Sequence, residues 1–391
     1  MATLKQATVK LDHEHIALVL QGGGALGAYQ AGVYEEIAKF PREPHWVAGV
    51  SIGAINAALI VGNPPERRVE RLREFWTLVT SRVGGMFPWL EIQQAAFHQF
   101  SAAVSASLGV TGFYTPRVPP PMFQPEGTDA AISYYDTAPL RDTLERLVNF
   151  KLINSKAMRL SVGAVNVRNG NSTYFDNMLQ HITVEHIMAS GALPPAFAPV
   201  MVDDEPYWDG GLVSNTPLQY VLDKRGPQKL LVAQIDLFNA RGALPINMAG
   251  VMSRQKDIMY SSRTRFNTDQ AARLQRDRRA VQNLIAKLPT RLRDDPEMKQ
   301  LAAEHRCSHV DIVHLIYRQS RFEQESKDYE FSRATMLEHW HAGQRDMQRT
   351  VEHPDWLTRS NPDEGVTVYD LAHDTSHDDK PHRARAAEKA R

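Results

Sequence analysis

The chain has 391 residues, enough for one large domain with an appendage or for two domains. Its 45 Lys and Arg residues equal its 45 Asp and Glu residues, so the net charge gives no indication of a nucleic-acid partner or of strong attraction to an anionic membrane. A single cysteine, Cys307, together with the lack of a secretory pattern and of any apolar run of ~20 residues, predicts a cytoplasmic protein whose lipid contacts are peripheral.

Short apolar runs alternate with helix-like stretches from Ile16 to about Phe238. This alternation predicts an α/β domain with a largely parallel central sheet. The expected strands are residues 16–20, 46–50, 158–167 and 230–237, and the first two expected helices are residues 28–40 and 52–61.

Residues 83–124 have a different composition, rich in Phe, Ala, Val, Gly and Pro and poor in charge. Two interpretations remain open for this segment. One is a buried helix followed by a proline-rich connector, and the other is an acyl-binding or interfacial flap, since long insertions often act as lids.

Beyond residue 242 the strand pattern is no longer visible, and polar helical stretches are expected at residues 252–286, 298–306 and 308–325. The final segment from residue 361 is charged and poor in large apolar residues, which is typical of a disordered tail. We therefore expect an N-terminal segment at 1–14, a catalytic domain at 15–242, a helical extension at 243–360 and a tail at 361–391.

The first expected strand leads into QGGGALGAYQAGV, in which Gly22, Gly24 and Gly27 satisfy the dinucleotide-binding pattern G-x-G-x-x-G. A dinucleotide site also requires an acidic residue about 20 positions later, to bind the ribose. The sequence around position 47 is HWVAGVSIGAINAAL and contains no acid. The glycines therefore need another explanation.

The second expected strand ends in Gly49-Val50-Ser51-Ile52-Gly53, a G-x-S-x-G sequence between an apolar strand and the helix-forming AINAALI. In such a nucleophile elbow the serine occupies a strained strand-to-helix turn, and the flanking glycines relieve the crowding that a Cβ would cause. This context predicts that Ser51 is a catalytic nucleophile.

The glycine-rich loop is suited to an oxyanion hole. Successive glycines allow backbone N–H groups to converge on one developing anion, and the following helix adds its dipole. Gly24 and Ser51 are 27 residues apart (51 − 24), the span of one βαβ unit, so the two loops should meet at one sheet edge. We assign Gly22, Gly23 and Gly24, with Gly27 behind them, to oxyanion and substrate binding.

A base for the serine is predicted at Asp209, in EPYWDGGLVSNTPL, where Gly210 and Gly211 form a tight turn. Taken alone, an Asp-Gly pair is usually an ordinary turn. A carboxylate with a pKa near 3.9 is a weak base for a hydroxyl, so burial near apolar groups such as Trp208 must raise the pKa or exclude water. We expect activity to fall at acidic pH and to be lost in Asp209→Asn.

Taken in this order, the motifs resemble those of the patatin-like phospholipases. GGGALG resembles the family's oxyanion motif, GVSIG its nucleophile elbow and DGG its aspartate turn, and ASGALPPAFAPV, from Ala189, is similar to the segment before that turn. Over residues 15–240 the resemblance implies a three-layer α/β fold, a Ser51–Asp209 dyad without a cofactor, and a lipid acyl hydrolase of the phospholipase A or lysophospholipase type. Many members have Arg or Lys where this chain has Leu26, which weakens the expectation of a phospholipid headgroup.

Several alternatives stay open. The substrate class includes esters of neutral lipids and of hydroxyacids, and the scaffold is also compatible with a non-catalytic lipid-binding protein. An α/β-hydrolase would instead use a histidine base. A zinc site at His305 and His309 lacks the H-E-x-x-H pattern, so no metal is expected. RLQRDRRAVQ interleaves Arg with an acid and with Gln, as on a solvated helix face rather than a nucleic-acid site. The candidate histidine bases are His305, His309, His314 and His339.

Overall fold

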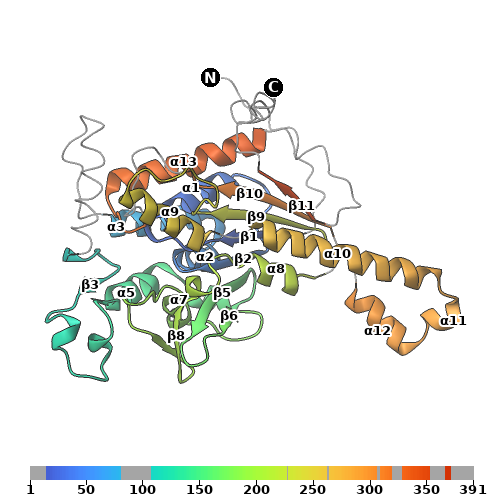
Figure 1. Ribbon diagram of the computed structural model, residues 1–391, viewed down its shortest axis with the longest axis horizontal. Helices are drawn as coiled ribbons and strands as arrows, with labels where there is room; N and C mark the ends of the chain where they lie inside the picture. The colour runs from blue at the N-terminus through green and yellow to red at the C-terminus, as the bar shows by residue number, and fades with distance from the viewer. Residues whose placement is uncertain are drawn as a thin grey trace, which may run out of the picture.

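The computed structural model describes residues 15–80, 107–226, 228–261, 264–305, 309–318, 328–352 and 366–370. One main sheet dominates this part of the chain (Figure 1). Its strands are β1 His15–Leu20, β2 Trp46–Val50, β5 Arg159–Asn166, β6 Ser172–Asp176, β7 Val200–Val202, β8 Glu205–Asp209, β9 Leu230–Asp236, β10 Val310–Ile316 and β11 Val366–Tyr369. Among the described residues they are ordered β11-β10-β9-β1-β2-β5-β8-β7, and β6 also pairs with β5.

The strands from β11 to β5 in this order are parallel, and the strands beyond β5 are antiparallel. Strand β1 lies at the centre, where Leu18 is paired with Val47 on one side and with Ala233 on the other. Its residues from Ala17 to Leu20 are buried on both faces of the sheet, as expected for a parallel sheet covered by helices. The predicted α/β class with a largely parallel sheet is confirmed.

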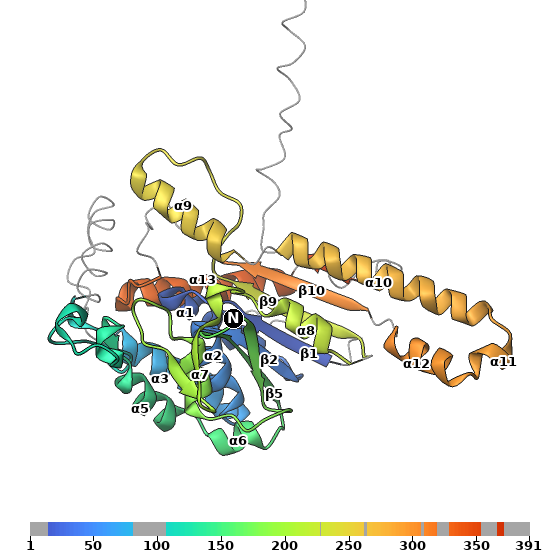
Figure 2. The same cartoon turned by 60° about the horizontal axis from the view of Figure 1, so that its bottom comes forward.

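Helices cover both faces of the sheet (Figures 1 and 2). On one face, apolar side chains of α1, α2, α3 and α13 form the larger core with one side of the strands. On the other face, Leu218, Val221 and Leu222 of α8 pack with Ala17 and Val19 of β1. The bounds of these helices are α1 Gly27–Ile37, α2 Ile52–Val61, α3 Pro65–Val79, α8 Leu218–Lys224 and α13 Arg333–Glu352.

Smaller elements complete the described part of the chain. A two-stranded ribbon of β3 and β4 precedes three helices, of which α7 packs against the antiparallel strands β7 and β8, and the remaining helices follow β9. In Figure 2, α9 and the pair α10 and α12 project from the body of the molecule. These elements are β3 Thr115–Pro116, β4 Tyr135–Asp136, α5 Ala138–Leu147, α6 Phe150–Asn154, α7 Val184–Ser190, α9 Met248–Tyr260, α10 Thr264–Lys287, α11 Thr290–Arg293 and α12 Pro296–Glu304.

Helices α1 and α13 are distant in the sequence and pack directly on each other (Figure 1). The contact is close enough that a Cβ on Gly32 would lie 1.9 Å from the carbonyl oxygen of Trp340, and one on Gly343 would lie 2.1 Å from that of Tyr29. Two glycines therefore allow the backbones to approach where any side chain would separate them. The last long helix is part of the same core as the first.

Two predictions for the last third of the chain are wrong. The helix expected over residues 308–325 is replaced by strand β10, Val310–Ile316, which pairs in parallel with β9. The tail expected from residue 361 contains strand β11, Val366–Tyr369, which pairs with β10. Consequently the sheet itself extends beyond the expected boundary at residue 242.

The ends of the other expected helices and strands fall close to the observed ones, or outside the described residues. The helix expected over 28–40 ends at Ile37, and the single stretch expected over 252–286 is two helices, α9 and α10. Residues 1–14, most of the segment 83–124, and Cys307 lie outside the described part of the chain. Of the helices that the structure describes, none combines the length and apolarity needed to span a membrane.

Candidate active site

A cavity of about 380 Å³ opens at the ends of the central strands and brings the predicted motifs together. Gly22, Gly23 and Gly24 follow β1, Ser51 follows β2, and Asp209 ends β8, and all five contribute to the cavity wall. Half of the remaining lining residues are aromatic, which suits an apolar ligand with few polar contacts. The aromatic residues lining the cavity are Phe113, Tyr114, Tyr135, Phe197, Phe238, Tyr260, Tyr329 and Phe331.

Ser51 has the strained backbone of a nucleophile elbow, with φ 56° and ψ −126° between β2 and α2. A non-glycine residue in this region costs on the order of 1–3 kcal/mol. The turn is crowded, because a Cβ on Gly49 would lie 2.3 Å from the carbonyl oxygen of Gly53, and one on Gly53 would lie 2.3 Å from that of Leu20. The predicted steric reason for both glycines holds in the structure.

Ser190, the last residue of α7, holds the elbow in place. Its hydroxyl accepts a hydrogen bond from the backbone N–H of Ser51 at 2.9 Å and donates one to the carbonyl oxygen of Gly163 at 2.6 Å. Ser190 has no exposed surface. One buried side chain therefore joins the strained turn to strand β5.

Asp209 lies with Ser51 in the cavity wall. Its register partner on β5 is Ala164, and its side chain accepts a hydrogen bond from the backbone N–H of Gly211 at 2.7 Å. Burial raises the pKa of Asp209 from 3.8 to about 6, and the nearby Ser51 hydroxyl and the Gly211 N–H limit the increase. The Gly210–Gly211 turn directs the carboxylate into the cavity wall.

The structure distinguishes among the amides of the glycine-rich loop. The N–H of Gly22 donates to the carbonyl oxygen of Asn215 at 3.1 Å, whereas no residue in the described ranges accepts the amide hydrogens of Gly23 and Gly24. Gly24 has φ +54°, which favours glycine. Gly27 lies behind the loop, where its α-carbon packs against Ile52. Gly23 and Gly24 are thus the amides that remain for a ligand in the cavity.

Sequence reasoning missed several residues that contact these loops. Ser190 lies in the quoted stretch ASGALPPAFAPV but received no role there. Gln21 and Asn215 hold the glycine-rich loop through side-chain hydrogen bonds, and Tyr260 and Asp328 accept hydrogen bonds through their carbonyl oxygens. These contacts join residues far apart in the sequence, and no local pattern indicates them.

The four candidate histidine bases lie elsewhere in the structure, and none of them lines the cavity. His314 contacts Asp236 at 2.6 Å, His309 contacts Asp311 at 2.9 Å, and His339 is buried in α13 beside Tyr317. His305 follows α12. In the residues with described positions, no three His, Cys, Asp or Glu side chains are grouped as metal ligands would be.

Leu26, the residue at which the glycine-rich loop departs from the motif it resembles, is fully buried in the larger core. It does not contribute to the cavity wall. The chain therefore places an apolar side chain behind the glycine-rich loop at this position and supplies no charge to the ligand from it.

Comparison with known proteins identifies two matching family models. One, described as patatin-like phospholipase, matches residues 18–222, and another, described as patatin phospholipase, matches residues 258–363. Among solved structures, VipD from Legionella pneumophila is similar over 91% of this chain and 72% of that chain, with 13% sequence identity and a TM-score of 0.34. No curated protein sequence gave a significant match.

Proposed function

Because the chain belongs to the patatin-like phospholipase family, whose members are lipid acyl hydrolases, we propose that it cleaves lipid carboxylic esters through a Ser51–Asp209 dyad and an acyl-enzyme. We further propose a phospholipase A or lysophospholipase type of reaction. The observation that carries the proposal is the placement of Ser51, in its strained elbow, and of the buried Asp209, whose pKa is about 6, in the wall of one cavity rich in aromatic side chains. A carboxylate with such a pKa is largely ionised at neutral pH and accepts a proton better than an exposed one.

In acylation, the Asp209 carboxylate takes the proton of Ser51 while the serine oxygen attacks the ester carbonyl carbon. The carbonyl electron pair moves onto its oxygen, and we assign the amides of Gly23 and Gly24 as donors to that anion. When the tetrahedral intermediate collapses, the carbon–oxygen bond to the alcohol breaks, and the alcohol leaves with the proton from Asp209. Ser51 then carries the acyl group.

In deacylation, Asp209 accepts a proton from water as the water oxygen attacks the acyl carbon. The same amides hold the second oxyanion, and its collapse releases the carboxylic acid and returns the proton to Ser51. Asp209 and the two amides thus act in both acylation and deacylation. Positioning contributes as well, because the elbow fixes the nucleophile before the substrate binds.

An exposed apolar face of α9 is the proposed contact with the lipid surface that holds the substrate. Helix α9 carries apolar side chains with helical spacing that are exposed, while Ser253 of the same helix is buried. The helix ends at Tyr260, which lines the cavity. An apolar helix face next to an acyl-binding cavity is suited to peripheral contact with a lipid surface from the cytoplasm. The exposed residues are Met248, Val251, Met252, Ile258 and Met259.

Two measurements test this function. Reaction with a fluorophosphonate ester should label Ser51 in the wild type and fail in Ser51→Ala; absence of labelling in the folded wild type would favour a lipid-binding protein without catalysis. A product profile over phospholipids, lysophospholipids and neutral or hydroxyacid esters, with Ser51→Ala and Asp209→Asn alongside, assigns the substrate. Release of fatty acid from a neutral ester alone would reject the phospholipase type but keep the dyad.

A further inference from the structure

The C-terminal segment matched by the second family model contacts the catalytic loops through two backbone carbonyl groups. These are the carbonyls of Tyr260, at the end of α9, and of Asp328, before α13. The proposed chemistry of Ser51 and Asp209 requires neither. The groups that donate hydrogen bonds to these two carbonyls all belong to the glycine-rich loop or to residues that hold it. This arrangement indicates that the C-terminal segment helps to position the loop.

The first contact satisfies the end of α9. The last carbonyls of a helix have no partner within the helix, and here the Tyr260 oxygen accepts hydrogen bonds from Gln21 Nε2 at 3.1 Å and Asn215 Nδ2 at 3.0 Å. The Asn215 amide also donates to the carbonyl oxygen of Gly22 at 3.0 Å, and the Asn215 carbonyl accepts the N–H of Gly22. Asn215 therefore connects the end of α9 to both the N–H and the carbonyl group of Gly22.

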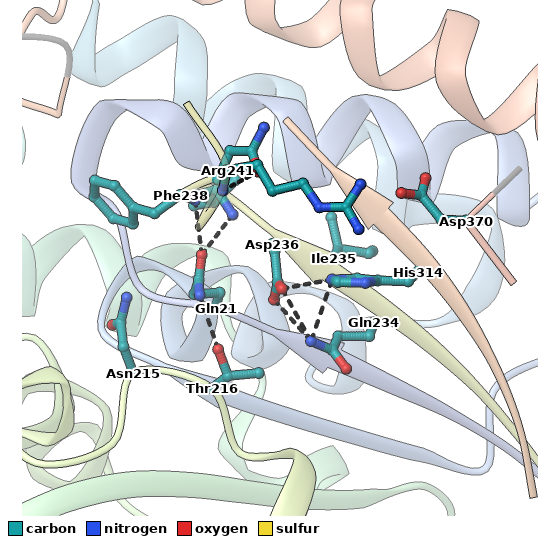
Figure 3. Close-up of polar contacts among 12 residues, drawn as sticks. Gln21, Asn215, Thr216, Gln234, Ile235, Asp236, Phe238, Arg241, His314 and Asp370 are labelled. Carbon is teal, nitrogen blue, oxygen red and sulfur yellow. Dashed lines mark hydrogen bonds and ion pairs between the residues drawn. The ribbon is translucent and has the colours of Figure 1, made fainter. Parts of the chain in front are cut away.

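Gln21 is the centre of this arrangement (Figure 3). Its Oε1 accepts the N–H groups of Leu237 and Phe238 at 2.6 and 2.9 Å, and its Nε2 donates to the Thr216 hydroxyl at 2.9 Å as well as to Tyr260. A glutamine amide offers two donor hydrogens and two acceptor lone pairs. All four are used, in a side chain with no exposed surface, directly before the first glycine of the loop.

The second contact lies on the other side of the loop. The carbonyl oxygen of Asp328 accepts the N–H of Ala25 at 2.7 Å and is so close to Gly24 that a Cβ there would lie 2.0 Å from it. The carboxylate of Asp328 pairs with Lys256 of α9 at 2.8 Å, and the Lys256 ammonium also lies 4.5 Å from the ring centroid of Tyr329. Lys256 therefore joins the two parts of the C-terminal segment that contact the loop.

We propose that the C-terminal segment acts as a clamp that fixes the glycine-rich loop between the carbonyls of Tyr260 and Asp328, and that Gln21 is the positioning residue that transmits this contact to the oxyanion donors. The clamp sets the direction of the Gly23 and Gly24 amides, which are the groups that stabilise charge in the reaction proposed above. Gln21 does not line the cavity and touches no reacting atom. The inference rests on the proposed function, whose own test is the loss of labelling in Ser51→Ala.

The test uses the full chain with Gln21→Met, which keeps the side-chain length and removes all four hydrogen bonds. We expect kcat for a short water-soluble ester to fall on the order of 10- to 100-fold, as for a displaced catalytic group. The rate of fluorophosphonate labelling should fall in parallel, because it needs the same oxyanion donors. KM and the apparent pKa of the acid limb should stay unchanged, since the cavity and Asp209 are not altered.

Gln234→Met is the matched control, because Gln234 is equally buried, lies on β9 and bonds to Asp236 away from the cavity. Its kcat and labelling rate should remain near the wild-type values at a temperature where both variants are folded. Equal losses in the two glutamine variants would overturn the clamp, and so would an unchanged kcat in Gln21→Met.

Lys256→Met provides an independent test if Gln21→Met does not fold, because the Lys256 side chain keeps 18% of its surface exposed and lies outside the cavity wall. The variant breaks the ion pair to Asp328 and should lower kcat and the labelling rate in the same direction. Wild-type values for both would overturn the proposal. Activity that survives in Ser51→Ala would instead reject the proposed function, so the two failures are distinguishable.

Discussion

The backbone N–H of Ser51 donates a hydrogen bond to the hydroxyl of Ser190, 139 residues further along the chain. The nucleophile therefore does not depend on its own turn alone. The positive φ of Ser51 is unfavourable for a residue with a side chain, and such strain persists only where the surroundings impose it. Ser190, on α7, supplies part of that constraint. Its hydroxyl is itself fixed by the hydrogen bond that it donates to the carbonyl oxygen of Gly163 on β5.

Ser190→Ala should weaken both catalysis and the fold. The change leaves the amide of Ser51 and the carbonyl of Gly163 without this buried partner, and each unsatisfied group costs about 1–3 kcal/mol. We expect a decrease in kcat on the order of 10-fold as the elbow relaxes, measured on a short ester together with the free energy of unfolding in urea. Ser161→Ala is the control, since its buried hydroxyl bonds to Trp46 and Asp176 outside the cavity. Stability loss in both variants with normal kcat in Ser190→Ala would contradict the role.

The raised pKa of Asp209 predicts the pH dependence of the reaction. Only the ionised carboxylate accepts the proton of Ser51, and burial places its pKa at about 6. The value of kcat/KM should therefore be constant above this pH and fall about tenfold per pH unit below it. A profile between pH 4 and 8 with a stable short-chain ester measures this, and fluorophosphonate labelling should follow the same curve. A limb near pH 4 would mean that Asp209 is solvated in the working enzyme.

The fold of the proposed catalytic motifs could be predicted because their geometry is local. The glycines around Ser51 are required by contacts within a few residues, and β2 and α2 have the expected bounds. Strand β10 was missed for a tertiary reason. Its polar residues Asp311 and His314 are three positions apart, a spacing that in an isolated sequence favours a helix with one polar face. In the structure both polar residues are buried with partners, His309 for one and Asp236 for the other.

The rest of the site could not be predicted because it depends on side-chain contacts with distant backbone. Gln21 and Tyr260 are 239 residues apart, and Asp328 reaches the glycine-rich loop through a main-chain carbonyl, which has no residue signature. Pattern reasoning finds the groups that we propose to react. It does not find the groups that hold them, because many residue types offer the same hydrogen bonds.

The close contact of α1 and α13 predicts an unusually large effect of a single methyl group. Gly343→Ala places a Cβ 2.1 Å from the carbonyl oxygen of Tyr29, and the two helix backbones must separate to accept it. Overpacking of this kind typically costs 1–3 kcal/mol, which thermal or urea unfolding can measure. Gly250→Ala on α9 is the control, because its Cβ would meet the Asn247 side chain at 3.1 Å rather than another helix backbone, so it should cost less than Gly343→Ala. Equal stability of Gly343→Ala and the wild type would mean that α13 is not fixed against α1.

The exposed face of α9 predicts a separable effect on lipid binding. Glutamates in place of Met252 and Ile258, which are 48% and 55% exposed and outside the cavity wall, should lower partitioning onto phospholipid vesicles. Two desolvated apolar side chains of this size contribute on the order of 3 kcal/mol, or about 100-fold in partition. Activity on a water-soluble ester should be unchanged. The control is Leu284→Glu on α10, 63% exposed, which should have no effect on partitioning. Equal losses from both helices would indicate a general charge effect instead.

The dyad also predicts that removing the catalytic charge stabilises the protein. The pKa of Asp209 is about 6 in the folded state and near 3.8 when unfolded, so the folded state binds the proton more tightly. Stability is therefore lost as the pH rises from about 4 to 6, and the difference corresponds to about 3 kcal/mol. Asp209→Asn removes this cost. Relative to the wild type, the free energy of unfolding of the variant should be larger at pH 8 than at pH 4, by up to that amount, while activity is lost. Urea unfolding at both pH values tests it, the pH 4 comparison serving as the internal control. A difference between the two proteins that does not change with pH would show that Asp209 is not desolvated, and would remove the physical basis for its role as the base.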